Sequence, residues 1–401
     1  MIGEKATDWS RLPVDLQHQF FEHAREEAEK HKRKLLEQKA KLEYFSRFLK
    51  FEPVPEDDRW GGWRIASVDG SYSPATSERI GARYGAYCAG YMTFEGDEFV
   101  DEGYRSGELS QDQLGDPDLT LRVLSLLCIK LEREMALRCL EEEGVDLLLM
   151  DGSFFGFRTK LGMIRREEID AEGFETVGEL TEHIRDLSLR LLYSRRVVGV
   201  IKRVRINAFD GWNVYTHRDE RHRIRRNDRA ILASIMPPKH WFAYQWLFGS
   251  PSALFTYGRL SGLRDGELAK ARESGKGMED LYRRYERLVE LDIKANLRCT
   301  APQVMRTARY YTRCTASVAP MCFEAHKDVD VEPLVAYFQA NHNPATGLPF
   351  PIDLIDQNVS LPQGFTKEFV EEVESLLIGD PELDKFDLSN YFMSINPQKE
   401  E

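Results

Sequence analysis

Two copies of the tripeptide Asp-Gly-Ser stand at the ends of apolar segments that predict buried β-strands. The first copy begins at Asp69 after Ile65–Val68, and the second begins at Asp151 after Val145–Met150. A strand that helices cover on both faces is apolar along its whole length, and ligands of open α/β sheets bind beyond the carboxyl ends of such strands. A single copy is ordinary turn chemistry. Two copies on two apolar strands favour a carboxylate site.

Glu134 is a third candidate carboxylate, on the helix expected before the second strand. An apolar stripe at Leu124, Leu127 and Leu131 marks the core side of this helix, and Glu134 continues the stripe. A carboxylate on the core side must be paired, protonated or bound to a metal, because burial of a bare charge is costly. The alternatives to a metal site are a buried ion pair with an arginine such as Arg133 or Arg138, or a helix so apolar that the stripe carries no information.

Three carboxylates form the oxygen-rich cluster that Mg²⁺ and Mn²⁺ select. Two such ions about 3.5 to 4 Å apart can activate water and neutralise the leaving oxygen of a phosphodiester. The pattern therefore predicts metal-dependent phosphodiester hydrolysis. Lys202 follows the apolar strand Val197–Ile201 and is a candidate for holding the scissile phosphate. The alternative is a lysine at a strand end that reaches solvent.

Charge is distributed unevenly along the chain, whose net charge is −12. From Arg195 to Arg229, eleven Lys or Arg stand against four Asp or Glu, a local charge of +7. From Thr366 to Glu401, three Lys stand against ten Asp or Glu, a local charge of −7. The local field decides where a polyanion docks. We expect a DNA-binding groove with aromatic stacking platforms in the basic run, which contains Arg221, Arg223, Arg225 and Arg226.

Two alternatives to an open DNA groove remain in the same region. A charge run is often only a solvated surface. The acidic C-terminal segment also has the charge needed to cover the basic run, which would make the protein inhibit its own DNA binding.

The composition of the 401-residue chain is that of a soluble globular protein. Charged residues interrupt the N-terminus, so we expect no signal peptide, and no apolar run reaches the length of a membrane span. The six cysteines lack the spacing of a zinc site or a disulfide framework. These features predict a cytoplasmic protein with reduced thiols.

The elements that must position the carboxylates alternate between helix and strand, which indicates a mixed α/β sheet. An N-terminal segment dense in helix formers, with an imperfect apolar stripe, is expected to pack on its own domain or on a second subunit. The expected elements are helix over Pro13–Phe51, a hairpin around Glu95–Asp97, helix from about Asp116 to Gly144, helix Val177–Ser194, strand Val197–Ile206, helix Glu279–Leu297, strand Thr307–Phe323, helix Glu332–Ala340 and helix Leu354–Val359.

The ordered set of these motifs resembles the NurA family of nucleases. In chain order, the set begins with the Asp69 strand, the Glu134 helix, the Asp151 strand and Val198–Lys202. Asn227–Ala233 resembles the start of the helix that follows the family's lysine strand. Gly347–Ile355 resembles the family's C-terminal Gly-Tyr-Pro-hydrophobic-Pro-Leu element. The resemblance covers about Arg64 to Asn358.

The resemblance implies an RNase H-like sheet and Mn²⁺-dependent DNA cleavage, as endonuclease and 5′-to-3′ exonuclease, with Mg²⁺ as an alternative ion and two ions per site. It also implies a homodimer and partnership with a HerA-type hexameric DNA-translocating ATPase in end processing. It places Asp69, Glu134 and Asp151 on metal-binding carboxylates. Where the family often has a C-terminal histidine ligand, this chain offers Asn358, with Asp356 close by.

We expect three parts: an N-terminal helical arm over residues 1–56, a nuclease domain over 57–365 and an acidic tail over 366–401. The arm and the tail follow from composition and charge and have no residue-level match to the family. Because a neutral Asn is a weaker metal ligand than a histidine or carboxylate, the alternative function is a catalytically weak DNA-clamping or scaffold subunit of a translocase complex. An actin-like ATPase is disfavoured, since bulky Tyr72 and Phe154 follow the two motifs where phosphate loops need glycine.

Overall fold

A computed structural model of the chain describes residues 12–393, apart from residues 75, 80, 97, 113–115, 162–163, 274–276, 363 and 384. The expected hairpin turn at Asp97, the first eleven residues of the expected arm and the last eight residues of the expected tail lie outside the described residues. Among the helices described, none combines the length and apolar character that a membrane span requires.

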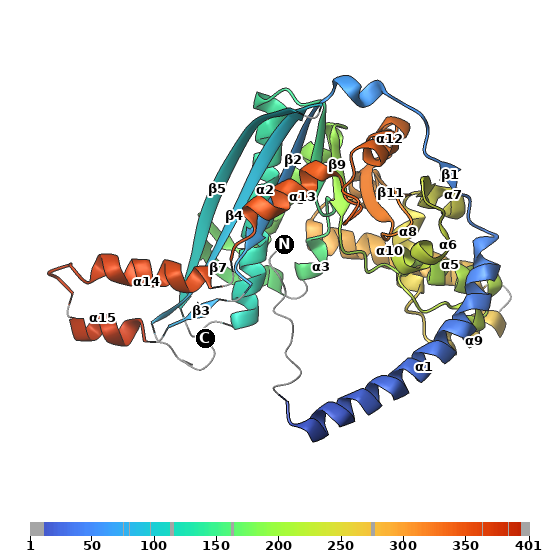
Figure 1. The fold of residues 1–401 in the computed structure, drawn as a ribbon, viewed down its shortest axis with the longest axis horizontal. Coiled ribbons are helices and arrows are strands. Elements are labelled where there is room, and N and C mark those ends of the chain that lie inside the picture. Colours follow the sequence, from blue (N-terminus) through green and yellow to red (C-terminus); the bar gives the residue numbers. More distant parts are fainter. Residues whose placement is uncertain are drawn as a thin grey trace.

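The centre of the fold is a mixed β-sheet to which ten of the described strands contribute (Figure 1). β2 pairs in parallel with β6, and β6 with β9, whereas the other pairs are antiparallel. The strand order is β1-β10-β11-β12-β9-β6-β2-β4-β3, and β5 pairs with β4. The bounds are β1 (Glu52–Pro53), β2 (Arg64–Tyr72), β3 (Ser77–Glu78), β4 (Ala82–Glu95), β5 (Glu98–Asp112), β6 (Leu147–Asp151), β9 (Val197–Ile201), β10 (His240–Ala243), β11 (Thr307–Arg313) and β12 (Met321–His326).

Helices cover both faces of the central strands. On β6, Leu148 and Met150 pack with α2, α4 and α10, whereas Leu147 and Leu149 point to the other face and pack with α12 and α13. Burial on both faces explains why these strands are apolar throughout, and it confirms the predicted mixed α/β class. The bounds are α2 (Pro117–Glu142), α4 (Val177–Tyr193), α10 (Gly277–Leu297), α12 (Glu332–Ala340) and α13 (Phe350–Val359).

The helix predicted from about Asp116 forms as α2. The Asp116 side chain caps it by accepting a hydrogen bond from the backbone N–H of Asp118 at 3.0 Å, and Pro117 occupies the first turn. Two strand predictions are wrong in extent. The strand expected over Val197–Ile206 ends at Ile201, and the one expected over Thr307–Phe323 is a pair of antiparallel strands, β11 and β12, with Pro320 in the turn between them.

The chain between β6 and β11 folds largely into short elements that the sequence pattern did not resolve. Several of them share an apolar cluster beside β10 and β11 that includes Phe209, Leu232, Phe242 and Tyr257. The basic run lies within this part of the chain. The bounds are α3 (Arg158–Leu161), β7 (Glu168–Ala171), β8 (Phe174–Thr176), α5 (Ala208–His217), α6 (Asp228–Ile235), α7 (Tyr244–Phe248), α8 (Ala253–Leu260), α9 (Asp265–Glu273) and α11 (Ala301–Val304).

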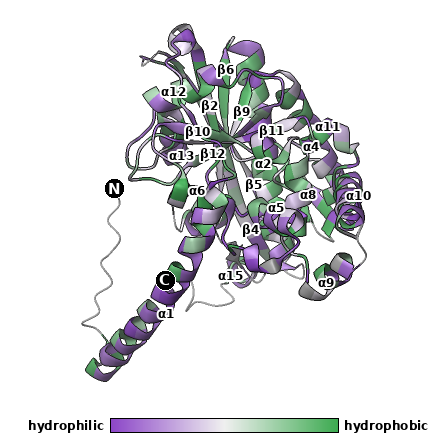
Figure 2. Cartoon of the chain, turned by 90° about the vertical axis from the view of Figure 1, so that its right-hand side faces the viewer, coloured by the Kyte–Doolittle hydropathy of each residue, from purple (hydrophilic) through white to green (hydrophobic). Residues whose placement is uncertain are grey.

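Two helical segments project from the ends of the molecule (Figure 1). Figure 2 shows one of them, α1, extending away from the body in the view turned by 90°. α1 leaves the body at one end, and Phe45, close to its C-terminus, is the residue of this helix that is buried. α14 and α15 project at the other end, where Val370, Leu388 and Phe392 pack on residues of β4. The bounds are α1 (Val14–Ser46), α14 (Phe365–Leu377) and α15 (Lys385–Tyr391).

Candidate functional site

The two Asp-Gly-Ser motifs meet at one edge of the sheet. The parallel register pairs Val68 of β2 with Met150 of β6, so Asp69 and Asp151 stand side by side. Asp151 is the last residue of β6, whereas β2 continues past Asp69 to Tyr72 along β4, so the expected end of the first strand before Asp69 is wrong. Lys202 follows the next parallel strand, β9. Its Nζ lies 2.7 Å from Oδ2 of Asp69 and 3.5 Å from Oδ1 of Asp151. The structure therefore brings together three of the residues that sequence reasoning selected.

Asp356 on α13 joins this group, and Asn358 does not. Oδ1 of Asp356 lies 2.5 Å from Nζ of Lys202. The side-chain amide of Asn358 instead donates to the hydroxyl of Tyr104 at 3.0 Å. Of the two C-terminal candidates, the aspartate is thus the one beside the strand-end carboxylates.

Glu132, which sequence reasoning missed, reaches the cluster from α2. It is 7% exposed, and its side chain lies over Gly70, where a Cβ would stand only 2.9 Å from Oε1. Its Oε2 lies 3.4 Å from Nη1 of Arg133. Glycine at position 70 therefore leaves the space that the Glu132 side chain occupies beside Asp69.

Glu134 lies elsewhere. Its Oε1 is 3.1 Å from Nζ of Lys130 and 3.5 Å from Nε2 of His183. Lys130 also pairs with Glu172 of the β7–β8 turn. Two residues along a helix are about 200° apart in direction, so Glu132 and Glu134 point to different sides.

The apolar stripe did not identify the glutamate that lies beside Asp69, because α2 is buried around most of its circumference. The core includes Leu124, Leu127 and Leu131, and also Leu126 and Leu137 on the opposite side of the helix. A helix that is apolar on all sides carries no directional signal. The signal that could have identified Glu132 is the missing side chain of Gly70, and this requires knowing that α2 crosses β2.

The carboxylates of the cluster are electrostatically crowded. Burial raises the pKa of Asp69 to about 8, and the negative charge of Asp151 adds to this shift. Burial also raises the pKa of Asp151. Burial disfavours the charge of Lys202, but Asp151 and Asp69 hold its pKa above the ordinary value. Lys202 thus contributes one positive charge, which is fewer than the number of carboxylates around it.

The donor set fits a hard divalent cation. Its members are carboxylates, and Oδ1 of Asp151 is buried without a hydrogen-bond partner. Among the described residues, no three His, Cys, Asp or Glu side chains are already gathered closely enough to hold a metal. The ammonium of Lys202 stands between Asp69, Asp151 and Asp356, where it supplies the positive charge.

A buried ion pair fixes the turn after Asp151, and sequence reasoning missed both partners. Glu324 of β12 accepts a hydrogen bond from the backbone N–H of Phe154 at 2.5 Å and from Nη2 of Arg309 at 2.8 Å. Gly199 of β9 allows the same turn to approach, because a Cβ there would lie 2.5 Å from the carbonyl oxygen of Gly152. These contacts hold the turn that directly follows Asp151.

The expected DNA-binding arginines lie on a loop between α5 and α6. Arg221 is 87% exposed and pairs with Asp219, while the side chain of Arg223 donates to the carbonyl of Leu263. Arg225 is exposed, and Arg226 is half-buried. No contact described for these four side chains reaches the carboxylate cluster.

Arg229, on α6, is the arginine of this region that contacts the cluster's backbone. Its Nη1 donates to the carbonyl oxygen of Lys202 at 2.6 Å, and its Nε donates to the carbonyl oxygen of Pro320 at 2.9 Å. It ties the segment after β9 to the turn before β12.

The expected stacking platforms are largely occupied by the protein's own rings. Trp212 packs against Phe45 and Phe48, and Trp241 packs against Trp246. All three tryptophans are half-buried. In this structure they hold α1 and the short helices together.

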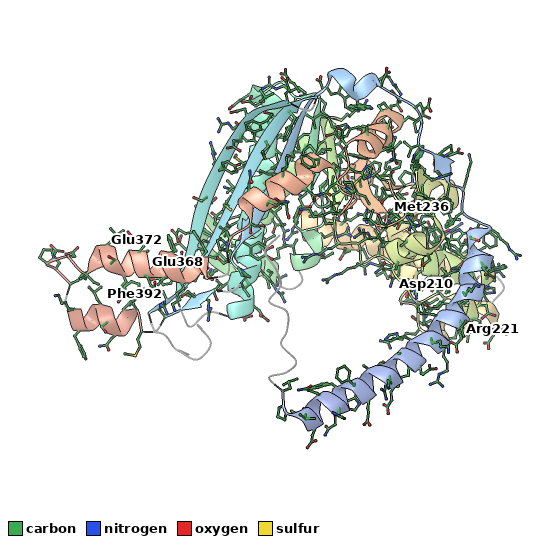
Figure 3. All side chains as sticks on the ribbon, viewed as in Figure 1. Asp210, Arg221, Met236, Glu368, Glu372 and Phe392 are labelled. Carbon is green, nitrogen blue, oxygen red and sulfur yellow. The ribbon has the colours of Figure 1, made fainter. Side chains whose placement is uncertain are left out.

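The described part of the acidic tail does not cover the basic run within one chain. Glu368 and Glu372 of α14 lie at one end of the long axis, and Arg221 lies at the other (Figure 3). Val370, between these glutamates, is buried against β4. The suggested self-inhibition is therefore absent from this arrangement of the described residues.

Comparison with known proteins gives the following matches. The family model described as the NurA domain matches residues 64–361. The crystal structure of the NurA nuclease from Sulfolobus solfataricus superposes with a TM-score of 0.54 and 14% identity, covering 93% of this chain and 100% of that chain. A crystal structure of NurA bound to dAMP and manganese has a TM-score of 0.47 and 12% identity, covering 94% and 99%. No curated protein sequence matches the chain. The first of these structures has the same fold as this chain.

Proposed function

Because the chain belongs to the NurA family, we propose that it is a metal-dependent deoxyribonuclease that hydrolyses phosphodiester bonds. The observation that carries this proposal is the group of carboxylates at the point where the parallel pairing of β2 and β6 ends. Asp69, Asp151 and Asp356 share the ammonium of Lys202, and Glu132 lies against Gly70 beside them. Carboxylates from distant parts of the chain, several of them buried, are costly to gather unless a cation binds there.

We propose that Asp69, Asp151 and Glu132 hold the metal, with Asp356 as an additional ligand. Glu132 takes the place that sequence reasoning gave to Glu134. The all-oxygen donor set is suited to Mn²⁺, with Mg²⁺ as the alternative, and its number of carboxylates is sufficient for two ions. When bound, such ions supply an activated water and charge neutralisation for phosphodiester hydrolysis.

Lys202 is proposed to exchange partners during function. Without a metal its ammonium neutralises the carboxylates, at 2.7 Å from Asp69 and 2.5 Å from Asp356. A bound cation would take over these carboxylates, so the ammonium would become available to hold the scissile phosphate. Arg229 keeps the backbone of Lys202 in place through its hydrogen bond to the carbonyl oxygen.

The Glu324–Arg309 pair is proposed to position Asp151. Both side chains are nearly excluded from solvent, at 3% and 13% exposed, and Glu324 binds the backbone of the turn that follows Asp151. A buried charge pair with a further backbone partner restricts the turn to one conformation. The Asp151 carboxylate is thereby held ready at the end of β6.

Several further properties are proposals that rest on family membership. They are endonuclease and 5′-to-3′ exonuclease activity, an RNase H-like sheet, a homodimer and action with a HerA-type hexameric ATPase in DNA end processing in the cytoplasm. We also propose that residues 1–56, 57–365 and 366–401 act as arm, nuclease domain and tail. The exposed arginines Arg221 and Arg225, with the half-buried Arg223 and Arg226, are proposed to contact the DNA backbone away from the metal.

The test is cleavage of linear DNA by the purified chain with Mn²⁺, alone and with a HerA-type ATPase. Asp69→Ala and Asp151→Ala are expected to abolish cleavage and leave the fold intact. Asp186→Ala, on the exposed surface of α4, is the matched control because its side chain is 61% exposed and pairs with Arg185. Undiminished cleavage by both site variants would refute the proposal. Absence of cleavage by the wild type in both settings would instead favour the DNA-clamping subunit.

A further inference from the structure

α1 is a long helix whose contacts with the described part of the body come from its C-terminal part. Its 33 residues extend about 50 Å. Near the C-terminus, Phe45 is buried, and Gln38 and Lys41 donate to backbone carbonyls of the basic loop. Every side chain from His18 to Glu37 is exposed. Helices in proteins gain most of their stability from packing, so this part of α1 is the kind of segment that a partner covers.

The exposed part of α1 carries large apolar side chains. Phe20 is 48% exposed, Leu35 is 53% exposed and Leu36 is 64% exposed. Leu16 and Phe20, then Ala24 and Ala28, follow one another at intervals of four residues and so share one side of the helix. The alanines leave the middle of this stripe open to the close approach of another helix.

The charges of α1 separate into two halves of equal and opposite sign. Val14–Glu29 contains five acidic residues and one basic residue, a net charge of −4. Lys30–Ser46 contains six basic residues and two acidic residues, a net charge of +4. The boundary between the halves lies one residue after Ala28.

We propose that α1 pairs in antiparallel orientation with α1 of a second copy of this chain. In such a pair each acidic half faces the partner's basic half, and a two-fold axis near Ala28 relates the two helices. Around this axis Phe20 of one copy lies close to Leu35 and Leu36 of the other. A two-fold contact of this kind is self-complementary, because each residue meets its partner twice.

The separated charges favour a second copy over the other occupants that the molecule suggests. DNA is a uniform polyanion and would be repelled by the acidic half. The α14–α15 segment is also acidic and would match only the basic half. An antiparallel copy matches both halves at once. Exposed ion pairs contribute little individually, so the charges set orientation while the apolar stripe contributes affinity.

This inference specifies the contact for the homodimer proposed above and does not depend on nuclease activity. The first test is disulfide cross-linking of the full chain with single cysteines introduced on α1, with the wild type as the background for its native cysteines. Ala28→Cys is expected to cross-link in high yield, because the two-fold axis passes near it. Leu16→Cys is expected not to cross-link above background. Cross-linking of both variants would indicate parallel helices, and cross-linking of neither would place the contact elsewhere; either outcome overturns the inference.

The second test is self-association, measured by light scattering at low salt. About an axis at residue 28, Glu22 and Glu26 of one helix face Lys34 and Lys30 of the other. Glu22→Lys with Glu26→Lys therefore places lysine against lysine, Lys30→Glu with Lys34→Glu places glutamate against glutamate, and the two changes together restore opposite charges in each pair. Each double variant alone is expected to associate at least tenfold more weakly than the wild type. An equimolar mixture, and the chain that carries all four changes, are expected to regain association.

The matched control reverses Glu368 and Glu372 to lysine on α14, at the other end of the molecule (Figure 3). This variant is expected to associate as the wild type does. If it loses association while the α1 variants keep it, the acidic segment is the contact and the inference is wrong. If a dimer persists in every variant, the homodimer stands and the pairing of α1 is refuted.

Discussion

The sharpest prediction distinguishes two glutamates on one helix. Glu132 is 7% exposed and lies against Gly70 beside Asp69, whereas Glu134 pairs with Lys130 and His183. Glu132→Gln removes a charge and keeps the shape of the side chain. Glu134→Gln makes the same chemical change two residues away and is the matched control.

The magnitude follows from the burial of Glu132. Two unit charges about 4 Å apart interact by about 4 kcal/mol at an effective dielectric constant of about 20, and water screens a side chain this buried only weakly. Since 1.36 kcal/mol corresponds to tenfold, Glu132→Gln is expected to reduce Mn²⁺-dependent cleavage by about 1,000-fold. Glu134 is 29% exposed and belongs to a surface ion pair, so Glu134→Gln should change the rate by less than about twofold.

Stability must be measured beside activity, because Glu132 is also a partner of Arg133. The Arg133 side chain is 3% exposed, and loss of a partner from a buried ion pair costs about 3 to 5 kcal/mol. Thermal unfolding separates this effect from a loss of chemistry. Glu132→Asp keeps the charge for Arg133 and withdraws the carboxylate by one methylene, so it should fold well and still bind Mn²⁺ weakly in calorimetric titration. Full cleavage by folded Glu132→Gln, or loss of cleavage in Glu134→Gln, would refute our placement of the site.

Further predictions test Gly199 and Glu324, which contact the turn after Asp151, the arginine-rich loop between α5 and α6, and the buried side chain of Asp228. Gly199→Ala would place a Cβ 2.5 Å from the carbonyl oxygen of Gly152. We therefore expect the unfolding free energy to fall by about 1 to 3 kcal/mol and the cleavage rate to fall at least tenfold. If both quantities stay unchanged, the turn after Asp151 does not approach β9 this closely. Glu324→Gln keeps the acceptor for the Phe154 backbone and weakens the ion pair, so it should lower Mn²⁺ affinity about 10- to 100-fold, and wild-type affinity in titration would remove its positioning role. Arg221→Ala should leave the melting temperature unchanged and reduce the slope of log K against log salt for DNA binding by about 1, whereas an unaltered slope would exclude Arg221 from the interface. Burial raises the pKa of Asp228 to about 8 from 3.8, so the folded state favours the neutral acid and loses stability as pH rises between these values; Asp228→Asn should flatten melting temperature against pH over this window, and a wild-type slope in the variant would show that another group is responsible.

The sequence by itself determined which strands carry the site. The apolar runs before Asp69 and Asp151 are local patterns, and burial on both faces of a central strand leaves no other composition. Lys202 could be predicted for the same reason, since it directly follows an apolar strand. The start of α2 could also be predicted from the sequence, because an Asp cap followed by proline acts within the first turn of a helix.

Only the tertiary structure decided which further carboxylates lie beside Asp69, Asp151 and Lys202. α2 is buried around most of its circumference, so its periodicity could not distinguish Glu132 from Glu134. The choice of Asp356 over Asn358 depends on how α13 crosses β2, and Glu324 comes from a strand three positions along the sheet from β2. Residues that converge from distant segments leave no local pattern in a single chain. Their proximity is set by the packing of whole helices and strands, which requires the complete fold.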